Sequence, residues 1–258
     1  MLNYMRAECY KLLHRKYMFL FSLVILACEA LLNAGFVFTN VNGSYVDFYT
    51  GGVMAAAFLT MGLYLAIVVA DAVFSDQYKY NTLKNEVSFG IPRTRIYLGK
   101  LLVTAMAGLV MAAIFLAFYE GLCFLTLPAG EAGSTRLTLT IVGYCALAAL
   151  PQWLGAVAVT NMFFFLLRSN AGAAFAALAV ICLPEFVLEL LSAFTFFSSG
   201  AYVVFQTLGS WMPGSMISGA AEQVGSWAYM GQSWLIGLVW VAVFTAAGLA
   251  VLRKKEIT

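Results

Sequence analysis

Apolar runs of about 20 residues recur along this chain of 258 residues, and they constrain its fold more than any other feature. A helix of that length crosses the hydrocarbon core of a bilayer, and only 10% of the residues are charged. The sequence therefore predicts an all-α membrane protein with no separate soluble domain. We place six spans at 17–38, 53–74, 97–127, 138–167, 171–191 and 233–252.

Lysine and arginine residues are distributed unevenly between the two sides of these spans. If the N-terminus lies inside, thirteen of the fourteen fall on the inner side, and only Arg136 falls on the outer side. Because such residues stay on the cytoplasmic side, we expect both termini in the cytoplasm and an even number of spans. The basic residues are spread over four separate segments, so a nucleic-acid partner finds no support.

The motifs of soluble enzymes are missing from the sequence. Gly99-Lys100 is followed by Leu101, so it is not a phosphate-binding loop, and the HExxH and GxSxG patterns are absent. The lone histidine, His14, is expected at the surface. The five cysteines include no CxxC pair, and the apolar run after Lys16 is too long for a cleaved signal peptide. We therefore expect no catalytic site, no metal site and no cofactor in this chain.

The first 16 residues form a predicted amphipathic helix. Its apolar face carries Leu2, Met5, Cys9, Leu12 and Leu13 at spacings near 3.6, while the basic residues elsewhere on it are Arg6, Lys11 and Arg15. Such a helix lies flat at lipid headgroups. Two interpretations stay open, a helix that also touches a cytoplasmic partner and a basic anchor that only fixes orientation.

A polar segment at 74–100 separates the second and third spans. Asn81 or Thr82 caps a short helix there, Gly90 suits a left-handed stop, and Pro92 begins the next helix. Such a short helix cannot bury an apolar face by itself, so we expect Leu83, Val87 and Phe89 to press on the membrane surface or on another protein. A purely structural inner loop is the alternative.

Besides Asp71, which we expect to pair with a nearby basic residue, four acidic residues fall within or near the spans, namely Glu29, Glu120, Glu185 and Glu189. Carboxylates in a membrane are costly and tend to mark transport paths, so all four are candidates for a substrate path. Glu185 and Glu189 follow Pro184, where we expect a break that admits water. They either line a path for a cationic substrate or reach toward the outer surface. The aromatic and glycine-rich stretch at 192–232 is expected at the outer leaflet, as a gate or as an aromatic belt.

The segment Phe74 to Lys100 resembles the first cytoplasmic loop of type-2 ABC exporter permeases, including those of bacitracin-resistance and lantibiotic-immunity systems. The matching residues are Ser75-Asp76, Thr82-Leu83-Lys84-Asn85, Gly90-Ile91-Pro92-Arg93 and Gly99-Lys100. The basic start, the six spans and the outer segment before the last span agree with this family over the whole chain.

The resemblance implies a coupling helix that docks on a separate cytoplasmic ATPase subunit, which would hold ATP and magnesium. Two permease subunits, identical or related, would pair in the lipid of a bacterial cytoplasmic membrane. It assigns ATPase contacts to Asn81, Thr82, Leu83, Lys84, Asn85, Glu86 and Val87, and loop shaping to Gly90 and Pro92. Amphiphilic peptide antibiotics or other hydrophobic compounds would be exported. An ion-coupled secondary carrier and a non-transporting immunity or scaffold protein are the alternatives.

Overall fold

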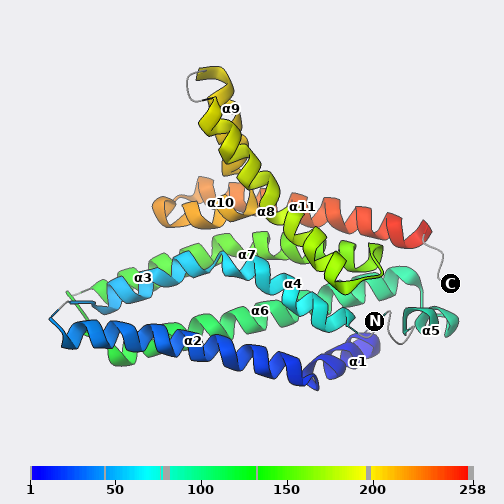
Figure 1. Cartoon of the computed structure of the whole chain (residues 1–258), viewed down its shortest axis with the longest axis horizontal. Coiled ribbons are helices and arrows are strands. Elements are labelled where there is room, and N and C mark those ends of the chain that lie inside the picture. Colours follow the sequence, from blue (N-terminus) through cyan, green and yellow to red (C-terminus); the bar gives the residue numbers. More distant parts are fainter. Residues whose placement is uncertain are drawn as a thin grey trace.

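The computed structural model describes residues 2–43, 45–75, 77, 82–131, 133–195 and 199–254. Within these ranges all regular secondary structure is helical, without a β-strand (Figure 1). The helices are α1 (Leu2–Leu13), α2 (Lys16–Val41), α3 (Phe48–Phe58), α4 (Met61–Phe74), α5 (Thr82–Ser88), α6 (Arg93–Thr126), α7 (Ser134–Leu166), α8 (Asn170–Phe194), α9 (Ser199–Ser210), α10 (Pro213–Ser218), the 3-10 helix η1 (Gly219–Gln223) and α11 (Trp227–Lys254).

The predicted all-helical membrane architecture is confirmed. Five helices, α2, α6, α7, α8 and α11, are long and apolar enough to cross a membrane, and the bent pair α3 and α4 brings the number to six among the described residues. Helix α7 forms the centre, because 67% of the residues in its most apolar stretch are buried, against 17% or fewer in the other four long helices. Those helices turn most of their apolar side chains outward, as a surrounding membrane requires.

The second predicted span is not one straight helix. Helices α3 and α4 meet at an angle of 53° around Leu59 and Thr60. The Trp153 indole Nε1 of α7 donates a hydrogen bond of 2.9 Å to the Leu59 carbonyl, and Gly62 leaves room for the ring, because a β-carbon there would collide with it. The Leu59 carbonyl at the break thus accepts a hydrogen bond from a side chain of a distant helix.

The last third of the chain also differs from the expectation at two points. Helix α8 continues without interruption through Pro184, so the predicted break there was wrong. The final span begins at Trp227, earlier than predicted, and its Gly237 lies directly against Pro151 of α7. The distal part of α8 and helix α9 project away from the other helices (Figure 1), whereas Met216 and Ile217 of α10 are buried.

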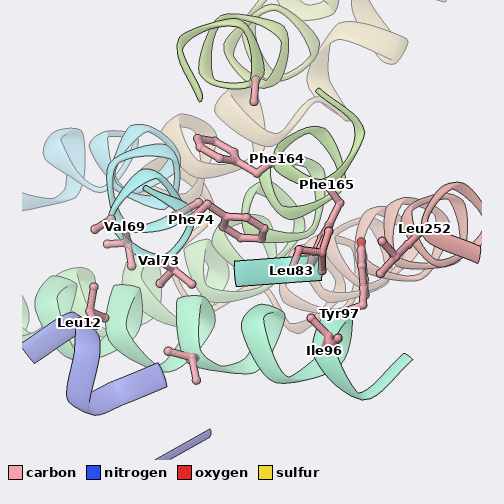
Figure 2. Packing of buried hydrophobic residues seen from close by; sticks show 14 of the residues in the cluster. Leu12, Val69, Val73, Phe74, Leu83, Ile96, Tyr97, Phe164, Phe165 and Leu252 are labelled. Atoms are coloured by element: carbon pink, nitrogen blue, oxygen red, sulfur yellow. The ribbon is translucent and has the colours of Figure 1, made fainter. Parts of the chain in front are cut away.

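One end of the bundle holds a hydrophobic cluster to which eight helices contribute, and Figure 2 shows part of it. Leu12 of α1, Phe74 of α4 and Leu83 of α5 meet there with Phe164 and Phe165 of α7, Tyr97 of α6 and Leu252 of α11. The aromatic rings pack closely, with the centroids of Phe74 and Phe165 4.9 Å apart. This inner cluster, as we call it, joins the short helices α1 and α5 to the membrane helices.

Candidate functional site

Helix α5 starts at Thr82 and ends in the predicted glycine stop, whereas the predicted cap by Asn81 lies outside the described residues. The Thr82 N–H donates to the Gln77 carbonyl at 3.1 Å, and at the other end the N–H groups of Gly90 and Ile91 donate to the carbonyls of Val87 and Glu86. Gly90 has φ of +80°, so this is the paired hydrogen-bond stop in which glycine avoids the strain of a left-handed residue. Pro92 directly precedes α6. The result is a short helix with two fixed ends.

The inward face of α5 differs from the expectation. Leu83 is only 5% exposed and packs into the inner cluster of its own chain, so the prediction that it needs an outside partner was wrong (Figure 2). Val87 is partly buried against the same cluster. The surrounding helices provide the apolar contacts that a seven-residue helix lacks. Lys84, Asn85 and Phe89 remain exposed on the outer side, and Phe89 is 85% exposed.

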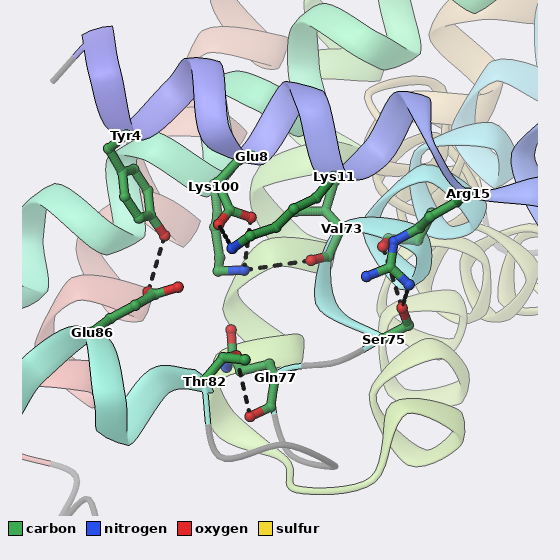
Figure 3. A network of polar contacts seen from close by, with 11 residues as sticks. Tyr4, Glu8, Lys11, Arg15, Val73, Ser75, Gln77, Thr82, Glu86 and Lys100 are labelled. Atoms are coloured by element: carbon green, nitrogen blue, oxygen red, sulfur yellow. Dashed lines mark hydrogen bonds and ion pairs between the residues drawn. The ribbon is translucent and has the colours of Figure 1, made fainter.

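A buried ion pair connects α1 with α6. The Lys100 ammonium lies 3.3 Å from the Glu8 carboxylate, and both side chains are 3% exposed (Figure 3). Lys100 also donates to the Val73 carbonyl at 3.4 Å and lies 4.9 Å from the centre of the Phe74 ring. Lys11, which is 51% exposed, approaches the other Glu8 oxygen at 2.6 Å. Glu8 is therefore held by one buried and one exposed cation.

A second contact connects α1 with α5. The Tyr4 hydroxyl donates to the Glu86 carboxylate at 3.1 Å (Figure 3). Gly99 of α6 permits this arrangement, because a β-carbon at that position would lie 2.6 Å from two atoms of the Tyr4 ring. Burial, followed by the charges of Glu8 and Glu86, raises the pKa of Tyr4, so the phenol keeps its proton and acts as the donor.

The two carboxyl groups of this network respond differently to their surroundings. Burial opposes ionisation of Glu8 most strongly, but Lys100 and Lys11 together outweigh it and lower the pKa of Glu8. Burial raises the pKa of Glu86, and the nearby charge of Glu8 adds to this effect, although Lys100 and the hydrogen bond from Tyr4 oppose it. Glu8 thus keeps its charge to a lower pH than an ordinary glutamate.

The start of α6 is also bound to the end of α11. The Arg93 guanidinium donates to the carbonyls of Leu252 and Arg253 at 2.9 and 3.1 Å. These carbonyls belong to the last turn of α11, where a cation is favourable because the helix leaves them unpaired. One turn further along α6, the Tyr97 ring lies directly against Gly248 of α11. Helices α1, α5, α6 and α11 are therefore connected by polar contacts at one end of the bundle.

The structure places the other predicted residues of this end as follows. Arg6 is exposed, and Arg15 donates to the Ser75 hydroxyl at the end of α4. The apolar face of α1 is as predicted at Met5, Cys9 and Leu12, whereas Leu13 is 65% exposed. Asn81 lies outside the described residues.

The four membrane carboxyl groups do not converge on one site. Glu185 of α8 accepts a hydrogen bond of 2.8 Å from the Ser215 hydroxyl and lies against Gly214, so it connects α8 to α10. Glu189 is exposed. Glu120 is packed against Gly52 of α3, and Glu29 lies on α2 beside a cavity between α2, α4 and α6.

Sequence reasoning did not assign roles to Tyr4, Glu8, Gly99 or Lys100. Two signals were available. Glu8 is the only acidic residue of the basic N-terminal segment, and Lys100 lies within the apolar run of the third span, where an unpaired charge is costly. Their partnership was not visible, because 92 residues separate them.

Comparison with protein-family models gives one match, to the ABC-2 family transporter protein model, over residues 4–183. The chain belongs to the ABC-2 transporter family. The match covers most of the chain, including α1, α5 and the network between them. A search of curated proteins gave no match. This ABC-2 protein is thus the multi-pass membrane component of an ABC transporter. The ABC-2 membrane domain does not contain the nucleotide-binding domain, so membership of the family implies an ATPase partner.

Proposed function

We propose that this ABC-2 protein is the permease subunit of an ATP-driven exporter and that its ATPase docks on the outer side of α5. The observation that carries the proposal is the construction of α5. It is a short helix with two fixed ends, a buried inner face and an exposed outer face of Lys84, Asn85 and Phe89. Phe89, which is 85% exposed at the end of this helix, adds an apolar group to the outer face that a docked partner would cover.

The charge distribution supports a cytoplasmic position for this end. Thirteen of the fourteen lysines and arginines fall on one side of the spans. The basic residues of α1, α5, α6 and α11, and those of the turn before α8, belong to this set. Positive residues favour the cytoplasmic side. We therefore propose that both termini and α5 face the cytoplasm, where ATP and magnesium bound to the partner are available.

A movement of α5 has two routes into the membrane helices. Leu83 would transmit it through the inner cluster to α4, α7 and α11 by direct packing. The Tyr4–Glu86 and Glu8–Lys100 contacts would carry it to α1 and α6. ATP can shift the equilibrium between two transporter states only if the ATPase binds α5 differently in each state. The contact residues Thr82, Lys84, Asn85, Glu86 and Phe89 would provide that difference.

The substrate class follows from the resemblance described above, and we propose amphiphilic peptide antibiotics or similar hydrophobic compounds. The test uses inside-out vesicles that contain a pair of permease subunits, with and without the partner ATPase. We expect uptake of a fluorescent lantibiotic peptide that requires both ATP and the ATPase. Uptake driven by an ion gradient without the ATPase would indicate a secondary carrier, and binding without uptake would indicate an immunity protein. Either result contradicts the proposal.

A further inference from the structure

A cavity of about 460 Å³ lies between α2, α4 and α6, beside the break between α3 and α4. Each helix contributes one stripe of side chains at helical spacing, as Phe21, Ile25 and Glu29 do on α2. Aromatic residues are frequent in its wall and include Tyr64, Phe115, Tyr119 and Trp153. A volume of this size is typical of pockets for small molecules, about 300–1,000 Å³, and it is too small for an entire antibiotic peptide.

Among the described residues that line this cavity, Glu29 is the only acidic or basic one. It follows Lys16, the first residue of α2, by 13 positions and precedes Val41, the last, by 12. At a rise of 1.5 Å per residue this is about 20 Å from either end, near the middle of a bilayer. Its Oε2 atom is buried, and no described residue donates a hydrogen bond to it.

An ionised carboxylate at this depth requires compensation. Membrane carboxylates pair with cations, with polar groups or with a ligand. The neighbouring lining residues are almost all apolar or aromatic, so the chain itself offers Glu29 no cation among its described residues. The faces of aromatic rings also attract cations. The aromatic wall and the Glu29 carboxylate therefore both favour a cationic ligand.

The cavity is open at the outer surface of the helix bundle. Cys28 and Met61 line it and are exposed, and Met61 is 61% exposed. Both lie on helices that present apolar side chains to the membrane. An amphipathic molecule dissolved in the bilayer can therefore reach the cavity from the side, without first crossing the bundle.

We propose that this cavity is a binding site for an amphipathic organic cation, with Glu29 as the charge partner and the aromatic wall around its apolar body. The inference goes beyond the proposed function, because the site lies within a single subunit and its occupancy requires no ATPase. Uncharged lipid is the competing occupant. A cavity that only accommodates lipid would bind a cation and an anion of the same shape equally well.

Two ions of the same shape and opposite charge test the proposal. Radiolabelled tetraphenylphosphonium and tetraphenylborate are titrated onto the full-length protein in nanodiscs, with empty nanodiscs subtracted, in the absence of any ATPase. We expect saturable binding of the cation and at least tenfold weaker binding of the anion. Equal binding of the two ions, or no saturable binding of the cation, overturns the proposal.

Substitutions then locate the site. Glu29→Gln keeps the shape of the side chain and should weaken cation binding at least tenfold. Glu120→Gln is the matched control, because Glu120 is also a carboxyl group with buried oxygens but does not line the cavity, and binding should stay within threefold. Ala112→Phe should block the site by filling it. Cation binding that survives both Glu29→Gln and Ala112→Phe contradicts the assignment. Because none of these binding measurements involves ATP, their outcome is independent of whether the chain exports peptides.

Discussion

The buried pair of Glu8 and Lys100 makes the sharpest prediction about the end of the bundle that carries α5. Removing one member of a buried ion pair leaves the other charge without compensation and costs about 3–5 kcal/mol. Glu8→Gln leaves Lys100 without its opposite charge, with only the Val73 carbonyl, the Phe74 ring and a neutral amide oxygen beside it, so we expect the docking of α1 to weaken by about 3 kcal/mol. In Lys100→Met, Glu8 keeps Lys11 as its partner, so we expect the docking of α1 to weaken by only about 2 kcal/mol.

Hydrogen exchange measured by mass spectrometry on α1 peptides reports this local opening directly. At 1.36 kcal/mol per factor of ten, exchange should accelerate about 150-fold in Glu8→Gln and about 30-fold in Lys100→Met. The control is Lys11→Met, which removes a cation that is 51% exposed and should change exchange less than about fivefold.

A double substitution separates the charge effect from general damage. Glu8→Leu combined with Lys100→Met replaces both charges with apolar groups, and such replacements are often neutral or stabilising. We expect α1 exchange in the double variant to return to within about 1 kcal/mol of the wild type. The reasoning is refuted if the two single variants exchange like the wild type, or if the double variant loses as much as the single losses summed.

Three further predictions concern pH, the helix break and the end of α5. Because the pKa of Glu8 is lowered from its ordinary value of 4.5, the contribution of Glu8 to α1 docking is present above pH 4.5 and is lost as the pH falls through the lowered pKa. Distances between spin labels on α1 and α5 should therefore lengthen as the pH falls through that value. No such pH-dependent lengthening is expected in Glu8→Gln. Trp153→Phe removes the indole hydrogen bond to the Leu59 carbonyl, which keeps the Gly62 N–H as a donor, and should destabilise the protein in SDS titrations by about 0.5–1.5 kcal/mol, whereas Trp234→Phe, at a site that is 39% exposed, should cost less than about 0.5 kcal/mol. Gly90→Ala places a side chain at φ +80° and should weaken α5 protection from exchange by about 1–2 kcal/mol, while Gly121→Ala, in a helix with open space, should not destabilise α6.

The membrane spans and the limits of α5 were predictable, because both depend on local signals. Apolar runs identify spans by length alone, and Gly90 followed by Pro92 marks a helix stop and a new start within three residues. No partner from elsewhere in the chain is needed for either conclusion.

The break in the second span and the direction of Leu83 were not predictable in the same way. No proline lies between α3 and α4, and the carbonyl at the break is paired by Trp153, 94 residues away. Leu83 turns inward because α1, α4, α7 and α11 meet at one place and provide an apolar site for it. Both features depend on contacts between distant segments, which spacing along one segment does not reveal.

The central claim is that the outer side of α5 is the surface on which the ATPase docks, and site-specific photo-cross-linking tests it most directly. A photoreactive amino acid is placed at Asn85, and in a matched variant at Leu137, which is exposed near the opposite end of α7. Both proteins are then irradiated in membranes that contain the partner ATPase. The account predicts a cross-linked product with the ATPase from position 85 and none from position 137. Cross-linking from position 137 alone, or from neither position although the ATPase co-purifies with the permease, would contradict it.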